Sequence, residues 1–185
     1  MLSAYRELAT AREAQGVPAL PLNAEQTQGL TELLQNPPAG EEEFLLHLLS
    51  ERIPPGVDEA AYVKATWLSA VAQGDAKSPL VSPLEATRLL GTMVGGYNVA
   101  ALIELLKHSD AALAGCAAEG LSRTLLVYDA FNEVMDLAAD NRFAKQVVDS
   151  WAAAEWFTCK PELADSMTVT VFKVCLLYTS PSPRD

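Results

Sequence analysis

The sequence predicts an all-α domain built from stacked antiparallel helices, followed by one β-strand. Apolar residues recur at spacings of three and four along most of the 185 residues. Short turns rich in proline and glycine separate these stretches, and no strand-like alternation occurs before Met167. Short helices joined by short turns favour helical pairs stacked in an α-solenoid, with an irregular helical bundle as the alternative.

Two helices are expected before residue 52. Asn23 and Gln26 form a capping-box pattern, and the helix that they open carries Leu30, Leu33 and Leu34. This helix should end at the Asn-Pro-Pro of residues 36–38. Three glutamates at 41–43 open the next helix, because acidic side chains stabilise the positive end of the helix dipole. Its expected buried residues are Phe44, Leu45, Leu48 and Leu49.

The next two helices begin at well-marked positions. Asp58 and Glu59 follow a Pro-Pro-Gly turn and precede one apolar stripe, which consists of Ala60, Val63, Trp67, Ala70 and Val71. Ser82 and Pro83 mark the clearest helix start in the chain, and Glu85 has the spacing to reach back to the Ser82 amide. Gly91 is expected to end that helix.

The remaining helices follow a Gly-Gly turn at residues 95–96. Their predicted stripes are Val99, Leu102, Ile103 and Leu106; Leu113, Cys116, Ala117 and Leu121; Phe131, Val134 and Leu137; and Phe143, Val147, Val148 and Trp151. Residues 168–174 alternate β-branched and other side chains, which predicts a strand that opens a second domain. The Pro-Pro-x-Gly-acid pattern occurs only twice, so any sequence repeat is weak.

The charge balance excludes some classes of function. The 13 Lys and Arg residues face 24 Asp and Glu residues, which gives a net charge of −11. Such an acidic chain lacks the basic face that non-specific nucleic-acid binding needs. The first seven residues lack the apolar segment of a signal peptide, and no apolar run reaches membrane-spanning length. We therefore expect a cytoplasmic protein.

No residue of the sequence is predicted to be catalytic, to bind a cofactor or to ligate a metal. His47 and His108 lack a partner at ligand spacing, and His47 is expected on the solvent side of its helix. Cys116 is interpreted as a small apolar residue, and Cys159 and Cys175 complete no CxxC pair. Residues 91–96 are rich in glycine but lack the Lys and Ser/Thr of a phosphate loop. The residues alone therefore indicate an acidic helical interaction module.

Several long segments resemble one protein family. They are residues 36–46, residues 52–65, residues 90–93 with 95–98, residues 150–157, and residues 163–174. Together these segments are similar to the N-terminus of the aconitase B family, the bacterial aconitate hydratases. The likeness extends over residues 1–174, and several of the segments exceed eight residues.

The resemblance implies a domain organisation and a role. Residues 1–157 would form a HEAT-like helical domain, and residues 158–174 a linker and the first strand of a truncated β/α swivel domain. Members of the family interconvert citrate and isocitrate through cis-aconitate and also act in 2-methylisocitrate dehydration. They use a four-iron four-sulfur cluster held by three cysteines far downstream, and none of the cysteines here matches them. The fragment alone would therefore be non-catalytic and hold no cofactor.

The resemblance also implies partners. The helical domain is associated in the family with protein contacts, with dimerisation and with the wall of a tunnel to the active site. Family members bind messenger RNA when the cluster is lost, and the acidity of this segment makes it a poor RNA surface. No membrane partner is expected. The alternative from another class is a free-standing acidic helical-repeat scaffold or adaptor protein. Extending the gene sequence would distinguish the two, because only an aconitase B gene should continue with a swivel domain and three cluster-binding cysteines.

The last eleven residues, 175–185, depart from the family pattern. They match the translation of a transposase sequencing adapter residue for residue, so we interpret them as a non-native tail without fold information. On this interpretation Cys175 is not a native cysteine. The strand at 168–174 would then lack its sheet partners, which should lie in the missing part of the swivel domain.

Overall fold

The computed structural model describes residues 1–124, 127 and 130–154, and every regular element within them is an α-helix. The all-α class is therefore confirmed for the described residues. The elements are α1 (Leu2–Glu13), α2 (Ala24–Gln35), α3 (Glu42–Glu51), α4 (Glu59–Gln73), α5 (Pro83–Leu90), α6 (Val99–Leu106), α7 (Ala111–Ser122), α8 (Ala130–Leu137) and α9 (Arg142–Ala152). The predicted strand at 168–174 and the tail at 175–185, which includes Cys175, lie outside the described residues, as does Cys159.

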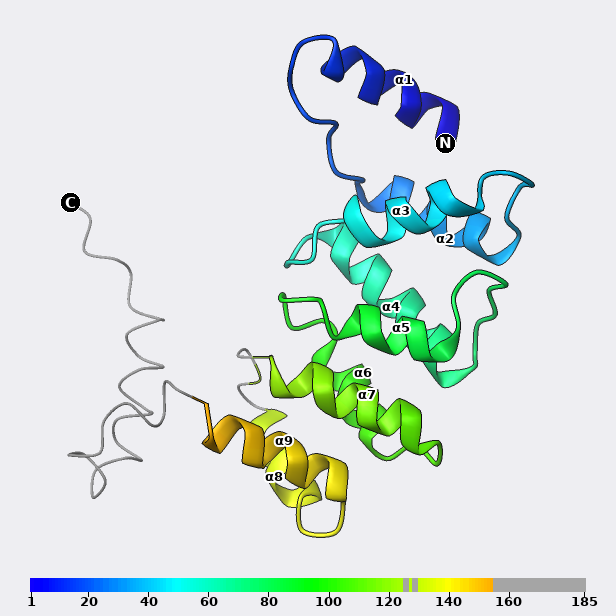
Figure 1. The fold of residues 1–185 in the computed structure, drawn as a ribbon. Coiled ribbons are helices and arrows are strands. Elements are labelled where there is room, and N and C mark those ends of the chain that lie inside the picture. The colour runs from blue at the N-terminus through cyan, green and yellow to red at the C-terminus, as the bar shows by residue number, and fades with distance from the viewer. Residues whose placement is uncertain (125–126, 128–129, 155–185) are drawn as a thin grey trace, which may run out of the picture.

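The helices are arranged as a stack that follows the order of the chain (Figure 1). α1 lies at one end of the stack, and α8 and α9 lie at the other. α2 packs on α3 and α4, α4 on α5 and α6, and α5 on α7. α6 packs on α7 and α8, and α9 packs on both α7 and α8. Each helix therefore contacts mainly helices that are one or two places away in sequence.

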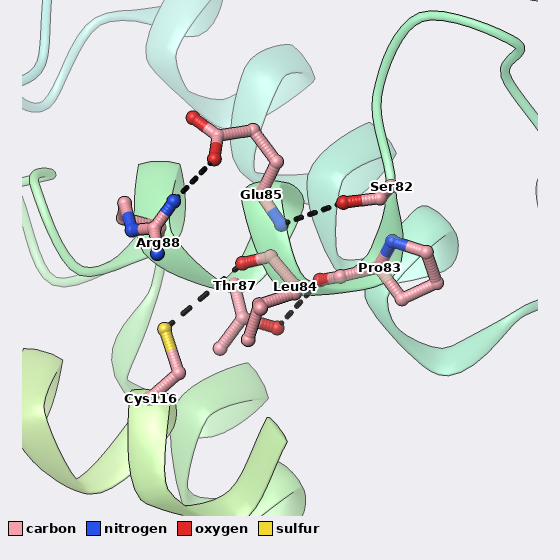
Figure 2. A network of polar contacts seen from close by, with 7 residues as sticks. All are labelled: Ser82, Pro83, Leu84, Glu85, Thr87, Arg88 and Cys116. Carbon is pink, nitrogen blue, oxygen red and sulfur yellow. Dashed lines mark hydrogen bonds and ion pairs between the residues drawn. The ribbon is translucent and has the colours of Figure 1, made fainter. Parts of the chain in front are cut away.

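The helix starts that the sequence marks most clearly are confirmed. Asn23 Oδ1 accepts a hydrogen bond from the Gln26 amide at 2.8 Å, and the Gln26 side chain accepts one from the Asn23 amide at 3.1 Å. Ser82 Oγ accepts from the Glu85 amide at 3.2 Å, and α5 ends at Gly91 as predicted. The Glu85 side chain does not turn back to Ser82: its carboxylate lies 2.6 Å from Arg88 Nη1 (Figure 2).

The core is broader in α4 than one stripe predicts. Ala60, Trp67 and Val71 are buried as expected, but Lys64 and Leu68 are buried as well. α4 packs against α2, α5 and α6. A helix with neighbours on several sides buries more than the narrow face that periodicity indicates.

One predicted core residue is wrong, because Phe131 of α8 is 42% exposed. Several other stripe residues are only partly buried, and five of these pack against the core: Leu33, Phe44, Leu137, Phe143 and Val148. The structure also contains α1, which the apolar spacing did not predict, and Tyr5 is the buried residue of that helix. All four residues predicted for the α6 stripe are buried, and Leu105 is buried in addition.

Gly91 and Gly120 allow α5 and α7 to approach closely. A Cβ atom built on Gly120 would lie 2.9 Å from the Gly91 Cα, and one built on Gly91 would lie 3.0 Å from the Gly120 Cα. Both distances are shorter than carbon–carbon van der Waals contact. Gly91 therefore has a packing role in addition to its predicted role at the end of α5.

Candidate interaction surface

The chemically reactive side chains of the described residues are dispersed. His47 is exposed on α3, as predicted, and His108 Nδ1 accepts a hydrogen bond from the Asp110 amide at 3.0 Å, just before α7. Among the described residues, no group of three or more His, Cys, Asp or Glu side chains could hold a metal ion.

Cys116 lies on α7 and faces the start of α5 (Figure 2). Its Sγ is 4.0 Å from the Leu84 carbonyl oxygen, and the side chain is partly buried. Burial raises the pKa of the Cys116 thiol, with a smaller opposing effect from Arg88. A raised pKa leaves little thiolate at neutral pH, so Cys116 is a poor nucleophile and a poor metal ligand.

α1 is held to the rest of the stack by long-range polar contacts. Arg6 forms a two-pronged ion pair with Glu41, in which its Nη1 lies 2.8 Å from Glu41 Oε1. The Arg6 guanidinium also lies 4.3 Å from the centre of the Phe44 ring. Arg52 Nε donates to the Tyr5 hydroxyl at 2.9 Å. Glu41, at the start of α3, therefore has a tertiary partner as well as the dipole role that the sequence predicts.

The segment from Glu25 to Glu59 carries a concentration of exposed carboxylates. Its exposed acidic residues are Glu25, Glu32, Glu42, Glu43, Glu51, Asp58 and Glu59. Arg52 is the only Lys or Arg in that segment, and its guanidinium is engaged by Tyr5 and by the Ala19 and Leu20 carbonyls. These carboxylates therefore give this end of the molecule a negative potential toward solvent.

Lys64 is a buried cation in the middle of α4. The residue is 2% exposed, and desolvation by burial lowers the pKa of its ammonium, with Glu51 opposing the shift. In the described part of the chain, two polar atoms elsewhere in the core are buried without a hydrogen-bond partner, Trp67 Nε1 and Asn98 Oδ1. These groups are dispersed in the core and line no pocket among the described residues, so we assign none of them to a binding site.

A group of exposed apolar side chains lies where two loops meet. Val57 follows α3, Val94 and Tyr97 follow α5, and Tyr62 is in the first turns of α4. All four are exposed. We call them the tyrosine–valine patch. This patch was not predicted from the sequence, because the two loops are far apart along the chain. Segments 52–65 and 95–98, which resemble the aconitase B family, contain three of its four residues.

Comparison with known proteins gives the family. The model of the aconitate B N-terminal domain matches residues 4–157. The chain belongs to the aconitase B family. It is 60% identical over 175 residues to aconitate hydratase B of Pseudomonas aeruginosa, and 58% identical over 174 residues to that of Synechocystis. A more distant relative, aconitate hydratase B of Helicobacter pylori, is 43% identical over 173 residues.

These matches cover 94% of this chain but only 20% of each aconitate hydratase B. The chain thus spans about a fifth of the length of the curated relatives that it matches. Among the described helices, none combines the length and apolar character needed to cross a bilayer. The match to the aconitate B N-terminal domain covers every described helix except the first two residues of α1.

Proposed function

We propose that this chain is the N-terminal interaction domain of an aconitate hydratase. The longer protein would interconvert citrate and isocitrate through cis-aconitate, and would also act in 2-methylisocitrate dehydration. The match of the aconitate B N-terminal domain to residues 4–157 carries this proposal, together with relatives that are named aconitate hydratase B. The domain would act by contact, including contact with a second copy of the longer protein.

The packing of the helices supports a HEAT-like α-solenoid. Neighbouring helices pack in sequence order from α2 to α9, which is the arrangement expected when helical pairs stack on each other. Such a stack offers an elongated surface relative to its core, and this suits binding better than chemistry. The domain boundary that we propose is residue 157, followed by the start of the swivel domain at 158–174.

The proposed enzyme would use a four-iron four-sulfur cluster. The residues described here do not fit such a group, because Cys116 has no neighbouring cysteine among them and its thiol pKa is raised by burial. The cluster would therefore be held outside the described residues, and we expect its three cysteines in the part of the enzyme that this chain does not cover. The exposed carboxylates of residues 25–59 also disfavour messenger RNA as a ligand of this domain, since phosphates would be repelled.

A domain exchange in a relative tests the proposal. In aconitate hydratase B of Pseudomonas aeruginosa, the matching N-terminal domain would be deleted in one variant and replaced by residues 1–157 of this chain in a second. Solution mass and the rate of citrate-to-isocitrate conversion would be measured for both. We expect the deletion to change the mass and lower the rate, and the replacement to restore them. Unchanged mass and kinetics after the deletion would show that the domain is a passenger.

A further inference from the structure

The loop between α3 and α4 and the loop between α5 and α6 form one joined unit. The Val94 amide donates a hydrogen bond to the Pro55 carbonyl oxygen at 2.9 Å. A Cβ atom on Gly95 would lie 2.0 Å from the Gly56 carbonyl oxygen, so only glycine permits this approach. Both loops lie along the same edge of the stack in Figure 1, in cyan and green. The edge that they form is fixed by backbone contacts.

This joined edge carries the tyrosine–valine patch. Val57 is 74% exposed, Val94 60%, Tyr62 57% and Tyr97 41%. The Tyr62 and Tyr97 rings meet edge to face with their centroids 5.4 Å apart. The Tyr97 hydroxyl donates to the Val57 carbonyl oxygen at 3.0 Å, which links the two loops a second time. The patch is therefore preformed, and a partner that binds it would spend little free energy on ordering it.

The exposure of these side chains has no explanation within the described fold. Four neighbouring large apolar side chains in water mark a contact surface more often than isolated ones do. Tyrosine is enriched at the centres of protein interfaces, because its ring buries a large area while its hydroxyl keeps a polar partner. The Tyr97 hydroxyl already has such a partner in the Val57 carbonyl.

Charge decides between the available occupants. Asp58 and Glu59 are exposed next to the patch, and the whole chain has a net charge of −11. Two copies that met patch to patch would place these carboxylates against each other across a symmetric interface, which costs free energy. A basic rim around an apolar surface would complement them. The matched relatives supply a candidate, since about four fifths of their length lies outside the region that this chain covers.

We propose that the tyrosine–valine patch is the docking site for an apolar surface with a basic rim on that remaining polypeptide. This inference rests on the proposed function, because it takes the chain to be one domain of a longer enzyme. A tethered partner has a high effective concentration, so a small patch is enough to hold it. The patch then fixes the edge of the stack that faces the rest of the enzyme.

Hydroxyl-radical footprinting tests this placement. The oxidation rates of Tyr62 and Tyr97 would be measured by mass spectrometry in the 185-residue chain and in the Pseudomonas aeruginosa relative that carries residues 1–157 of this chain. We expect both rates to fall by about fivefold in the longer protein, because oxidation follows exposed area and the core of an interface is fully buried. Equal rates in the two proteins would overturn the proposal.

A matched pair of variants ties the protection to the patch. The double substitution Val57→Ser and Val94→Ser should remove the protection of both tyrosines, whereas Val17→Ser, at an exposed valine after α1, should leave it unchanged. All three valines are exposed, so the substitutions create no cavity, and circular dichroism of the isolated chain checks that it folds. Protection that survives the double substitution would contradict the proposal. Protection that appears in the isolated chain as its concentration rises would show that a second copy is the occupant.

The two proposals fail separately in this design. Turnover of citrate by the exchanged protein reports on the enzymatic role, and the footprint reports on the patch. Tyrosine protection without turnover would refute the proposed function and leave the docking surface in place. Turnover without protection would refute the docking surface alone.

Discussion

The contact between α5 and α7 makes a prediction that runs against helix propensity. Replacing a glycine inside a helix with alanine normally stabilises a protein by about 1 kcal/mol. Gly120 lies near the end of α7, and its new methyl group would lie 2.9 Å from the Gly91 Cα. That atom belongs to the backbone at the end of α5, so it cannot rotate away as a side chain would. Relief requires α5 and α7 to separate.

The size of the effect follows from two opposing terms. Overpacking a core costs about 1–3 kcal/mol, and a backbone clash belongs in the upper part of that range. Subtracting the propensity gain of about 1 kcal/mol leaves a net loss of about 1–2 kcal/mol for Gly120→Ala. In a domain of this size, such a loss lowers the melting temperature by about 2–8 °C.

Gly115 provides the matched control in the same helix. A Cβ atom there would meet only Phe143 Cε1, at 3.6 Å, which is ordinary van der Waals contact. Gly115→Ala should therefore stabilise the domain by up to about 1 kcal/mol. Urea unfolding followed by circular dichroism at 222 nm measures both variants. A Gly120→Ala protein as stable as Gly115→Ala would refute the argument from close helix approach.

Three further predictions concern single polar residues. Lys64→Met should stabilise the domain by about 1 kcal/mol, because a buried charge is replaced by an apolar side chain of similar length. Burial lowers the pKa of Lys64 in the folded state, so the unfolded chain binds more protons between that pKa and the unfolded value near 10.4. The free energy of unfolding should therefore rise with pH across this window. Lys64→Met should flatten the rise, which urea unfolding at several pH values measures. The hydrogen bond from Arg6 lowers the pKa of Glu41, so docking of α1 should weaken as pH falls through that lowered pKa and the carboxylate is protonated. Glu41→Gln removes the charge at every pH, so it should speed proteolysis near α1 at neutral pH. Ser82→Ala should cost about 1 kcal/mol in thermal unfolding through loss of the α5 cap, and an unchanged melting temperature would contradict this.

The sequence was sufficient where the relevant interaction is local. The Asn23–Gln26 capping box and the Ser82 cap span three residues each, so both could be predicted from spacing alone. The end of α5 at Gly91 was also predictable, but its reason was not. Gly91 is needed because Gly120 lies against it, and nothing in the sequence places these two residues together.

The features that could not be predicted all depend on residues far apart in the chain. α1 lacks an apolar stripe and is docked through Arg6 and Glu41, which are 35 positions apart. Burial of Lys64 follows from the helices that surround α4 on several sides. The tyrosine–valine patch forms because the Tyr97 hydroxyl reaches the Val57 carbonyl, 40 positions away. Periodicity reports one face of one helix and carries no information on such pairings.

Among the described residues, the acidic side chains without an ion pair are concentrated at one end of the stack. From α5 onward, most pairs join residues three or four positions apart, as in Arg88 with Glu85 and Arg123 with Glu119. Such exposed pairs add little stability but neutralise the surface locally. Between Glu25 and Glu59, Glu41 is the one acidic residue with an ion pair in the described structure. The field of the domain is therefore strongest around α2, α3 and the start of α4, next to the tyrosine–valine patch. A basic partner would be drawn to that end first, and the patch at its border would then fix the partner's position.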